Sequence, residues 1–175
     1  MALQAYLKLT GQKQGEIKGS ITQAGRKEKI GVIAVHHQIT SPRDPATGLP
    51  SGKRQHKPLV ITKELDKSSP LLYQALVTNE VISDWELMFY SSGISAQKAM
   101  GNEQNHYTIK LVNATISNIE FFMEHTRKAA AGGTSGLDLQ VQTPEYEKVA
   151  FTYQKIIWTW IDGGVTAEDD WESPT

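Results

Sequence analysis

The segment that most constrains this fold is residues 147–161 (EKVAFTYQKIIWTWI), which are rich in β-branched and aromatic side chains. Such side chains lose χ1 freedom in a helix and favour a pleated surface. The segment stops at Asp162-Gly163-Gly164, a sequence typical of a turn. Successive side chains of a strand point to opposite faces, and apolar residues occupy both faces here. We therefore predict one long strand that is covered on both sides.

Trp158 and Trp160 lie in the second half of this segment, and two interpretations of them stay open. Both can pack inside their own domain. Alternatively, one face of the strand can meet another subunit, because tryptophan is enriched in interface cores. Tyr153, from the same segment, is a third candidate. The sequence does not decide between core and interface for these three side chains.

The length and composition exclude several classes of site and partner. A chain of 175 residues fits one domain, which we take as residues 1–175, and it is long enough to bury roughly 70% of its unfolded surface. It has no cysteine, which excludes disulfides, thiolate metal sites and thiol nucleophiles and suits a reducing compartment. With 18 basic and 19 acidic side chains the net charge is −1. This balance argues against nucleic acid as a partner.

The beginning of the chain does not resemble a secretory signal. Residues 1–15 have no basic region followed by a continuous apolar stretch. The sequence also contains no apolar run of about 18 residues, so we expect no membrane insertion. We expect a protein that is made soluble and that, if exported, uses a route independent of a signal peptide.

Period-two alternation of apolar and polar residues predicts several further strands. They are expected at residues 3–9, 17–21, 30–39, 54–63, 81–90 and 106–123. Gly11 and Gly15 are expected to bracket a turn. Many strands without strand–helix alternation predict a mainly β fold, a small antiparallel β-barrel or two-sheet sandwich with a flanking helix.

The flanking helix is predicted at about residues 69–78, within residues 66–78 (DKSSPLLYQALVT). Ser68 or Ser69 supplies the N-cap, and Pro70 occupies the first helical position, where a missing N–H costs nothing. An apolar stripe at helical spacing is expected to pack on the sheets. It consists of Leu71, Leu72, Ala75 and Leu76.

A long protruding loop is predicted at about residues 41–52. Residues 40–52 (TSPRDPATGLPSG) contain three prolines and two glycines and cannot continue a strand ladder. Loops of this length in compact domains are commonly functional, although an idle surface loop is the alternative. Further loops are predicted at residues 91–105 and 125–136, and Trp171 suggests that the acidic tail docks on the domain.

The five histidines do not form a recognisable site. His36 and His37 point to opposite faces of a predicted strand and cannot chelate one ion together. His56, His106 and His125 lie in separate segments, and no carboxylates form a recognisable acid–base pair. We expect ordinary surface or hydrogen-bonded histidines, and we predict no catalytic, cofactor-binding or metal-binding residue.

One extended motif in residues 52–75 (GKRQHKPLVITKELDKSSPLLYQA) is specific. It consists of Gly52, Arg54, His56, Pro58, Thr62-Lys63-Glu64, Asp66, Ser68-Ser69-Pro70 and Leu72-Tyr73-Gln74-Ala75. This pattern resembles the haemolysin-coregulated proteins of bacterial type VI secretion systems. Two further matches are Pro42-Arg43-Asp44 with Gly48, and the closing Tyr153, Lys155, Ile156, Trp158 and Thr159. The resemblance spans nearly the whole chain and departs at residues 91–105 and 125–136.

The resemblance implies a small β-barrel that assembles into hexameric rings. The rings stack into the inner tube of a contractile injection machine, and the tube is expelled with its cargo. The family's core domain has no enzymatic activity, and no cofactor is implied. The implied partners are further copies of the chain, contractile sheath proteins, a spike protein of the valine-glycine-repeat family and effector proteins in the lumen. The implied location is the cytoplasm at assembly, followed by secretion without a signal peptide.

The protruding loop is the best candidate for stacking the rings, because of its position. We hypothesise that Arg43 and Asp44 make polar contacts between rings, since charged groups on a protruding loop can set register. Pro42, Gly48 and Gly52 complete this candidate site. A ligand-binding β-barrel and a β-barrel hydrolase or metal enzyme are the alternatives. A monomer under native conditions would favour them.

Overall fold

The computed structural model describes residues 4–92, 103–123 and 145–171. These residues form thirteen strands and one helix. In chain order the elements are β1 (Gln4–Gly11), β2 (Gly15–Ile17), β3 (Ile30–Val32), β4 (Ala34–His36), β5 (Ile39–Thr40), β6 (Gln55–His56), β7 (Leu59–Glu64), α1 (Ser69–Val77), β8 (Val81–Ser92), β9 (Glu103–Val112), β10 (Ala114–Met123), β11 (Glu145–Thr152), β12 (Lys155–Trp160) and β13 (Val165–Asp170). Among the described residues, no helix is both long and apolar enough to cross a membrane.

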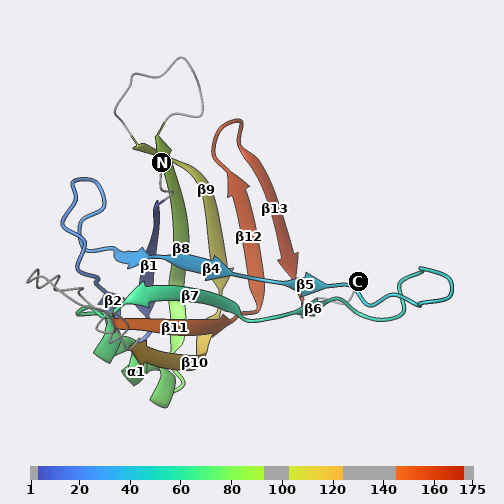
Figure 1. The fold of residues 1–175 in the computed structure, drawn as a ribbon, viewed down its shortest axis with the longest axis horizontal. Coiled ribbons are helices and arrows are strands. Elements are labelled where there is room, and N and C mark those ends of the chain that lie inside the picture. The colour runs from blue at the N-terminus through green and yellow to red at the C-terminus, as the bar shows by residue number, and fades with distance from the viewer. Residues whose placement is uncertain (1–3, 93–102, 124–144, 172–175) are drawn as a thin grey trace, which may run out of the picture.

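Eleven of the strands form one antiparallel sheet that curls on itself. β8 pairs with β1 along one side, and on its other side it pairs first with β10 and then with β9. From β10 the sheet continues through β11 and β7 to β4, and from β9 it continues through β12 to β13. In Figure 1 the strands β10, β11, β7 and β4 run across the direction of β9, β12 and β13. The mainly β fold with one flanking helix is therefore confirmed, as a curled half-barrel.

The chain turns corners where the sequence predicted long strands. Residues 147–161 form two strands, because the chain bends at Tyr153 and Gln154 and β11 and β12 pair with different partners. The large buried side chains lie at odd positions up to Tyr153, with the small Ala150 as the one exception in β11, and burial resumes at Ile156. The prediction of one strand covered on both faces was wrong, because the switch from odd to even positions marks a corner.

A second corner lies beside the first. Residues 106–123, predicted as one strand, divide into β9 and β10 at Asn113, whose φ of +51° places it in the left-handed region that asparagine tolerates. The Asn113 side-chain amide donates to the Oε1 atom of Gln154 at 2.6 Å. The two corners therefore support each other where the chain leaves the barrel for the β9–β12–β13 part of the sheet.

Three other predicted strands also differ from the structure. Residues 30–39 divide into β3, β4 and β5, because the chain leaves β1 at Ile33 and joins β7. Residues 54–63 divide into β6 and β7 at Pro58, which has no N–H to donate to a ladder. Residues 17–21 do not form a strand beyond Ile17, where β2 ends.

Helix α1 covers one end of the barrel and packs against β10 (Figure 1). Its N-cap residue is Ser68, although the Ser68 side chain makes no capping hydrogen bond, and Pro70 lies in the first turn. Of the predicted stripe, Leu72 and Ala75 are buried, and Leu71 is exposed. The helix is therefore held by a narrower apolar face than its sequence predicts.

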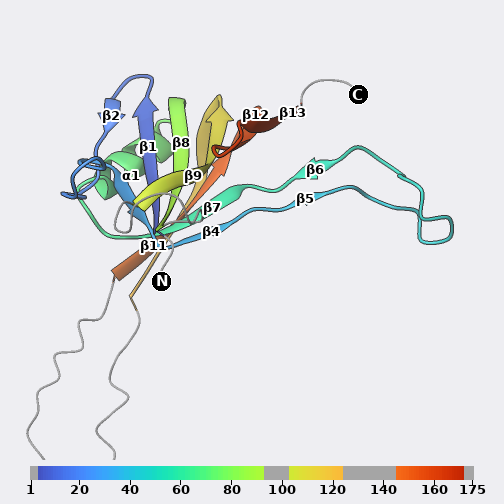
Figure 2. The same cartoon turned by 90° about the horizontal axis from the view of Figure 1, so that it is seen from above.

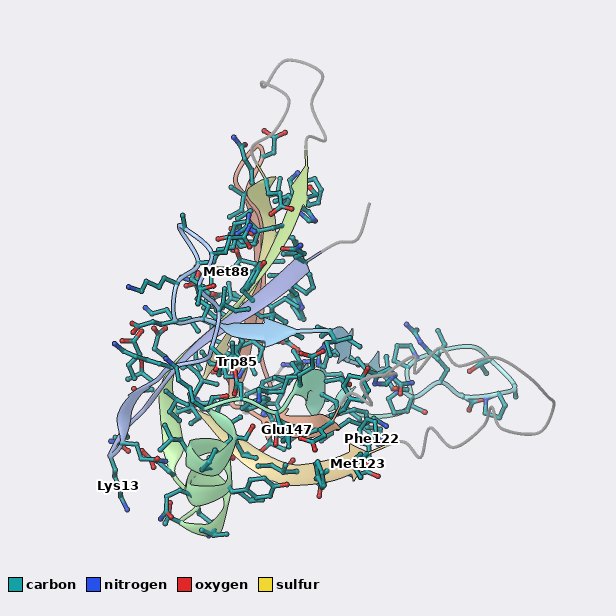
Figure 3. The ribbon with its side chains drawn as sticks, turned by 60° about the vertical axis from the view of Figure 1, so that its left-hand side comes forward. Lys13, Trp85, Met88, Phe122, Met123 and Glu147 are labelled. Atoms are coloured by element: carbon teal, nitrogen blue, oxygen red, sulfur yellow. The ribbon has the colours of Figure 1, made fainter. Side chains whose placement is uncertain are left out.

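The barrel interior is filled by side chains from most of the strands. Trp85 of β8 meets Phe151 of β11 edge to face, with ring centroids 5.4 Å apart. Figure 3 shows Trp85 and Glu147 inside the fold, and Lys13 and Met123 at its periphery. The core around Trp85 includes Leu7, Leu9, Ile17, Ile30, Leu59, Ile61, Leu72, Ile82, Leu87, Ile116, Val149 and Ile156.

The predicted turn between Gly11 and Gly15 is confirmed as the β1–β2 hairpin. The buried carboxylate of Glu80 accepts hydrogen bonds from the backbone amides of Lys13 and Gln14 at 2.6 and 2.8 Å. A Cβ atom on Gly11 would lie 2.5 Å from this carboxylate, so any larger residue there would displace the Glu80 side chain. Burial alone would raise the pKa of Glu80, but the hydrogen bonds from Gln14 and Lys13 outweigh it and lower that pKa.

Candidate functional site

The predicted protruding loop is a hairpin formed by residues 39–56, which we call the arm. Figure 2 shows the arm extending far beyond the barrel. At its base β5 pairs with β6, and further out Arg43 is bridged to Pro50. The Ser51 amide donates to the Pro42 carbonyl at 3.0 Å. These backbone hydrogen bonds keep the two limbs of the arm together.

Asp44 shapes the tip of the arm. Its Oδ1 atom accepts hydrogen bonds from the amides of Ala46 and Thr47 at 2.7 and 3.1 Å. Its backbone amide donates to the Leu49 carbonyl, and its carbonyl accepts from the Gly48 amide. Gly48 has a φ of +71°, a conformation that glycine adopts without strain. The tip is therefore a folded turn, and the Asp44 carboxylate is used inside it.

The outer surface of the arm presents one cation and one large apolar side chain. Arg43 is exposed, and its guanidinium has no hydrogen bond or ion pair within the described residues. Leu49 is 64% exposed. Pro42 is half-buried, and a Cβ atom on Gly52 would lie in ordinary contact with it, at 3.8 Å. Arg43 and Leu49 are thus the side chains at the tip best placed to meet another molecule.

A polar cluster, which we call the arm network, holds the base of the arm against β13. It consists of His37, Arg54, His56, Tyr153 and Asp169. The Oδ2 atom of Asp169 lies 2.5 Å from Arg54 Nε and 2.8 Å from His56 Nε2. The Tyr153 hydroxyl lies 2.8 Å from His56 Nδ1 and 2.6 Å from His37 Nε2. One chain of hydrogen bonds thus joins β13 to the second limb of the arm and to His37, which lies just before the first limb.

Neutral histidines satisfy every member of the arm network. The Asp169 carboxylate can only accept, so His56 Nε2–H donates to it and His56 Nδ1 accepts from the Tyr153 hydroxyl. The Tyr153 oxygen then accepts from His37 Nε2–H. Burial lowers the pKa of His37, and so does repulsion from His56 and His36 when these are protonated. The Arg54 hydrogen bond lowers the pKa of Asp169. Burial also raises the pKa of Tyr153.

The predicted docking of the tail through Trp171 is confirmed. The Trp171 indole N–H donates to the Tyr153 carbonyl at 2.6 Å, and a second guanidinium nitrogen of Arg54 donates to the Asp170 carbonyl at 2.7 Å. The loop predicted at residues 125–136 lies outside the described residues. Of the loop predicted at residues 91–105, the described ends belong to β8 and β9.

Sequence comparisons place this architecture among known proteins. A family described as "Type VI secretion system effector, Hcp" matches residues 6–160. The "Major exported protein" of Pseudomonas aeruginosa PAO1 is 36% identical over 183 residues, which cover 99% of this chain and 98% of that protein. The chain belongs to the Hcp family.

Solved structures of other Hcp proteins share the fold. One described as an Hcp protein superposes with a TM-score of 0.82 at 31% identity, covering 99% of this chain and 100% of the other. A mutant of Hcp1 from the E. coli EAEC 042 pathovar gives 0.78 at 30% identity, covering 97% and 99%. The "Secreted protein Hcp3" from Pseudomonas aeruginosa gives 0.72 at 31% identity, covering 98% and 100%.

Hcp is a structural, non-enzymatic family, so family membership confirms the expectation that the chain is not an enzyme. Within the described residues, no group of three or more His, Asp or Glu side chains could hold a metal ion. The fold does bring His37 and His56 together. Both bond to the Tyr153 hydroxyl, and both support the arm.

The Hcp motif around Lys63 forms a second polar cluster, which we call the helix network. The Lys63 ammonium lies 2.7 Å from Glu147 Oε1, 2.9 Å from Asp66 Oδ1 and 3.0 Å from the Ser69 hydroxyl. Lys63 and Glu147 are fully buried, and the Ser69 hydroxyl also donates to Glu147. Burial would raise the pKa of Asp66, but hydrogen bonds from Ser68 and Lys63 outweigh it and lower that pKa. The network ties the start of α1 to β7 and β11.

The three aromatic candidates occupy different environments. Tyr153 is buried within the arm network, and Trp158 is partly buried and packs against the core. Trp160 is 39% exposed, and its ring lies beside the rings of His106 and Tyr107. Of the three, Trp160 has the surface that a neighbouring molecule could cover.

Sequence reasoning missed the arm network. Arg54, His56 and Tyr153 were in the resemblance motifs. Asp169, the partner of Arg54 and His56, lies in the acidic tail, and His37, a partner of Tyr153, was in a predicted strand. No local spacing connects these residues, because 113 positions separate His56 from Asp169. The docking signal of Trp171 was the only indication that the tail returns to the arm.

Proposed function

We propose that the chain is a structural subunit of the type VI secretion inner tube, in which six copies form a ring and rings stack. The observation that carries the proposal is membership of the Hcp family together with an arm that projects from the barrel and is fixed at its base. We further propose that residues 1–175 act as one domain in this assembly.

Lateral contacts in a ring join two different surfaces of each copy. The rotation from one copy to the next must bring the last copy back to the first. Trp160 supports such a contact, because tryptophan is enriched in the cores of interfaces. Val165 and Ile161 are exposed beside it at the β12–β13 turn. We infer that this apolar edge meets the neighbouring copy in the ring.

The arm is suited to stacking one ring on the next. Its tip is held rigid by Asp44, and the Arg43 guanidinium has no partner among the described residues. In this proposal Arg43 makes the contact between rings, and Asp44 also acts through the shape of the turn. Pro42, Gly48 and Gly52 set the backbone path that carries them.

The further partners follow from the same proposal. They are contractile sheath proteins outside the tube, a spike protein of the valine-glycine-repeat family at its end and effector proteins in its lumen. The chain would assemble in the cytoplasm and then be secreted without a signal peptide. Support comes from the names of two relatives, the "Major exported protein" and the "Secreted protein Hcp3".

Native mass spectrometry and negative-stain electron microscopy test the proposal. We expect a species of six times the chain mass, annular particles with six-fold symmetry and stacks of these rings at high concentration. A chain that stays monomeric at high concentration in all buffers would overturn the proposal and would favour a ligand-binding barrel or a β-barrel enzyme.

Arg43→Ala and Asp44→Ala test the role of the arm within this assembly. We expect both variants to keep hexamers and to form fewer stacks. Lys53→Ala, which removes another exposed cation of the arm away from the tip, is the matched control.

A further inference from the structure

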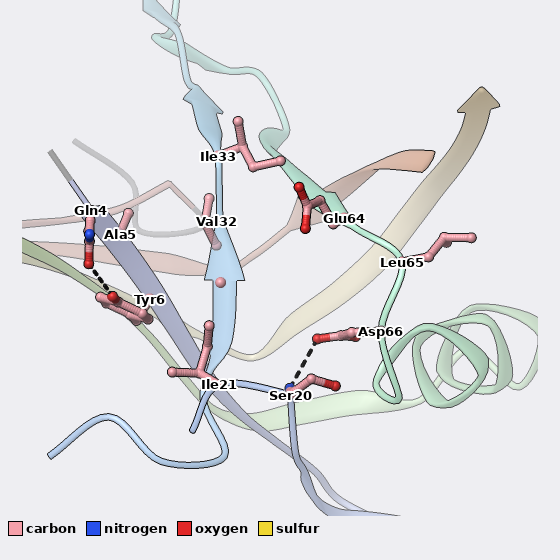
Figure 4. Close-up of a pocket in the computed structure, with 11 residues that line it drawn as sticks. Gln4, Ala5, Tyr6, Ser20, Ile21, Val32, Ile33, Glu64, Leu65 and Asp66 are labelled. Atoms are coloured by element: carbon pink, nitrogen blue, oxygen red, sulfur yellow. Dashed lines mark hydrogen bonds between the residues drawn. The ribbon is translucent and has the colours of Figure 1, made fainter. Parts of the chain in front are cut away.

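A surface groove of about 600 Å³ lies between β1, β3 and the segment that follows β7 (Figure 4). Two large apolar side chains stand exposed on its rim, Ile33 at 56% and Leu65 at 38%. Figure 4 shows Glu64 between these two side chains, and Glu64 is also exposed. Within the described residues the Glu64 carboxylate has no ion pair or hydrogen-bond donor. The groove therefore combines uncovered apolar surface with an unpaired negative charge.

The groove is preformed. Its wall is held by a hydrogen bond from the Ser20 amide to Asp66 Oδ2 at 3.3 Å, drawn in Figure 4. Asp66 is in turn fixed by the buried Lys63 of the helix network. A ligand would therefore meet a rim whose position is already set, which reduces the ordering cost of binding.

The groove and the arm lie at opposite ends of the molecule. β7 runs away from the arm, and its Glu64 end lies on the far side of the barrel, near β2 and α1 (Figures 1 and 2). The arm tip of one copy therefore cannot occupy its own groove. If the arm of one copy fits the groove of the next, the contact is head-to-tail. When the copies are related by translation, such a contact repeats along a line and does not close into a ring.

The arm tip is complementary to the groove in charge and in polarity. The tip presents the unpaired Arg43 and the exposed Leu49, and the groove rim presents the unpaired Glu64 with two exposed apolar side chains. Among the described residues, those that line the groove include two carboxylates, Glu64 and Asp66, and no lysine or arginine. Complementary charges of this kind favour one register and one partner.

We propose that this groove receives the arm tip of a second copy of the chain. Leu49 of one copy packs against Ile33 and Leu65 of the next, and Arg43 pairs with Glu64. The inference rests on the proposed stacking of rings through the arm, and it names the surface that the arm meets.

A charge-reversal cycle tests the pairing. We expect Arg43→Glu and Glu64→Arg each to lower the stacked fraction at least about tenfold, because each places like charges together. The double variant should recover most of the wild-type stacking. The stacked fraction is measured by sedimentation velocity and electron microscopy at fixed salt. In the matched control, Lys53→Glu combined with Glu64→Arg should show no recovery. A double variant that stacks no better than its weaker parent would overturn the inference.

Cysteine cross-linking gives a second measurement, since the chain has no cysteine of its own. Leu49→Cys combined with Leu65→Cys should give, under mild oxidation, a ladder of dimers, trimers and longer disulfide-linked chains. Leu49→Cys combined with Val77→Cys, which places the second thiol at an exposed helix position, should give no ladder. Equal ladders in both variants, or none in the first, would overturn the inference.

The outcomes separate the inference from the proposed function. Rings and stacks that survive every groove substitution would overturn the inference and leave the tube proposal standing. A wild-type chain without rings would overturn both.

Discussion

The helix network and the arm network use similar groups in different surroundings. In the helix network the Lys63 ammonium and the Glu147 carboxylate are wholly removed from solvent. In the arm network the Arg54 and Asp169 side chains are each about a quarter exposed, 22% and 25%. Buried charges must be paired to be tolerated, whereas partly solvated pairs gain less and cost less. We infer that the first network holds the fold together and that the second sets the direction of the arm.

Removing the Lys63 ammonium should produce the largest effect and would most clearly break this comparison. Lys63→Ala leaves the buried Glu147 carboxylate without its cation, so we expect a loss of about 3–5 kcal/mol in the free energy of unfolding. Denaturant unfolding followed by circular dichroism measures it. Replacing both partners, Lys63→Met with Glu147→Leu, is the control and should keep most of the stability. A loss below about 1 kcal/mol in Lys63→Ala would contradict the assignment.

Removing the Tyr153 hydroxyl should have a smaller global effect and a larger local one. Tyr153→Phe breaks the link between His37 and His56, so we expect a loss of about 1 kcal/mol. Hydrogen exchange should become faster in β5 and β6 and stay unchanged in β8. Tyr73→Phe, at a half-exposed helix position, is the matched control and should change neither quantity. Equal acceleration throughout the barrel would argue against a local role.

Mild acid should distinguish the two networks. The pKa of His37 in the folded protein is lowered from 6.5. Below about pH 6.5, His37 therefore binds a proton more readily in the unfolded chain than in the folded one, which favours unfolding. Stability should therefore decline as the pH falls from 6.5 towards 5. Asp66 in the helix network has a pKa lowered from 3.8, so its contribution is present above that value and is lost only in stronger acid.

Unfolding measured across this pH range checks the prediction. His37→Gln should flatten the slope between pH 6.5 and 5, and His36→Gln, at an exposed position, should leave most of it. An unchanged slope in His37→Gln would show that another group is responsible.

Removing the Arg54 guanidinium should have the smallest effect on global stability. Arg54→Ala breaks a partly solvated ion pair, so we expect an unchanged denaturation midpoint. The amides of β6 should nevertheless exchange faster, since Arg54 also donates to the Asp170 carbonyl. Lys53→Ala serves as the comparison, because Lys53 is an exposed neighbour on the same limb. A large shift of the midpoint would remove the distinction between the two networks.

The fold class was predictable from the sequence, but the corners were not recognised. Alternation identified the strands, and Pro70 identified the helix. The signal for each corner was present as a switch between even and odd positions among the side chains that face the core. The switch runs from Val32 to the partly buried Val35, from Leu111 to Ala114 and from Tyr153 to Ile156. A two-sided apolar segment was therefore two strands that meet at a corner of the same curled sheet. The pairing partners that show this are distant in sequence.

The candidate site was predictable where it depended on local chemistry. Prolines and glycines located the arm, and the structure confirms that it protrudes. The part played by Asp44 in the turn, the meeting of His37 and His56 at Tyr153, and the return of Asp169 depend on the folded path of the chain. Alternation and spacing carry no information about such contacts.

The attachment of the arm to β13 has a consequence for the order of events during translation. The arm emerges from the ribosome early, but Asp169 lies in the last described strand. A nascent chain that ends before Asp169 carries the hairpin without its anchor, so the arm gains its direction only when synthesis of the strands is complete. We therefore expect incomplete translation products to be poor additions to a growing polymer, and immature chains on neighbouring ribosomes to have little tendency to join one another.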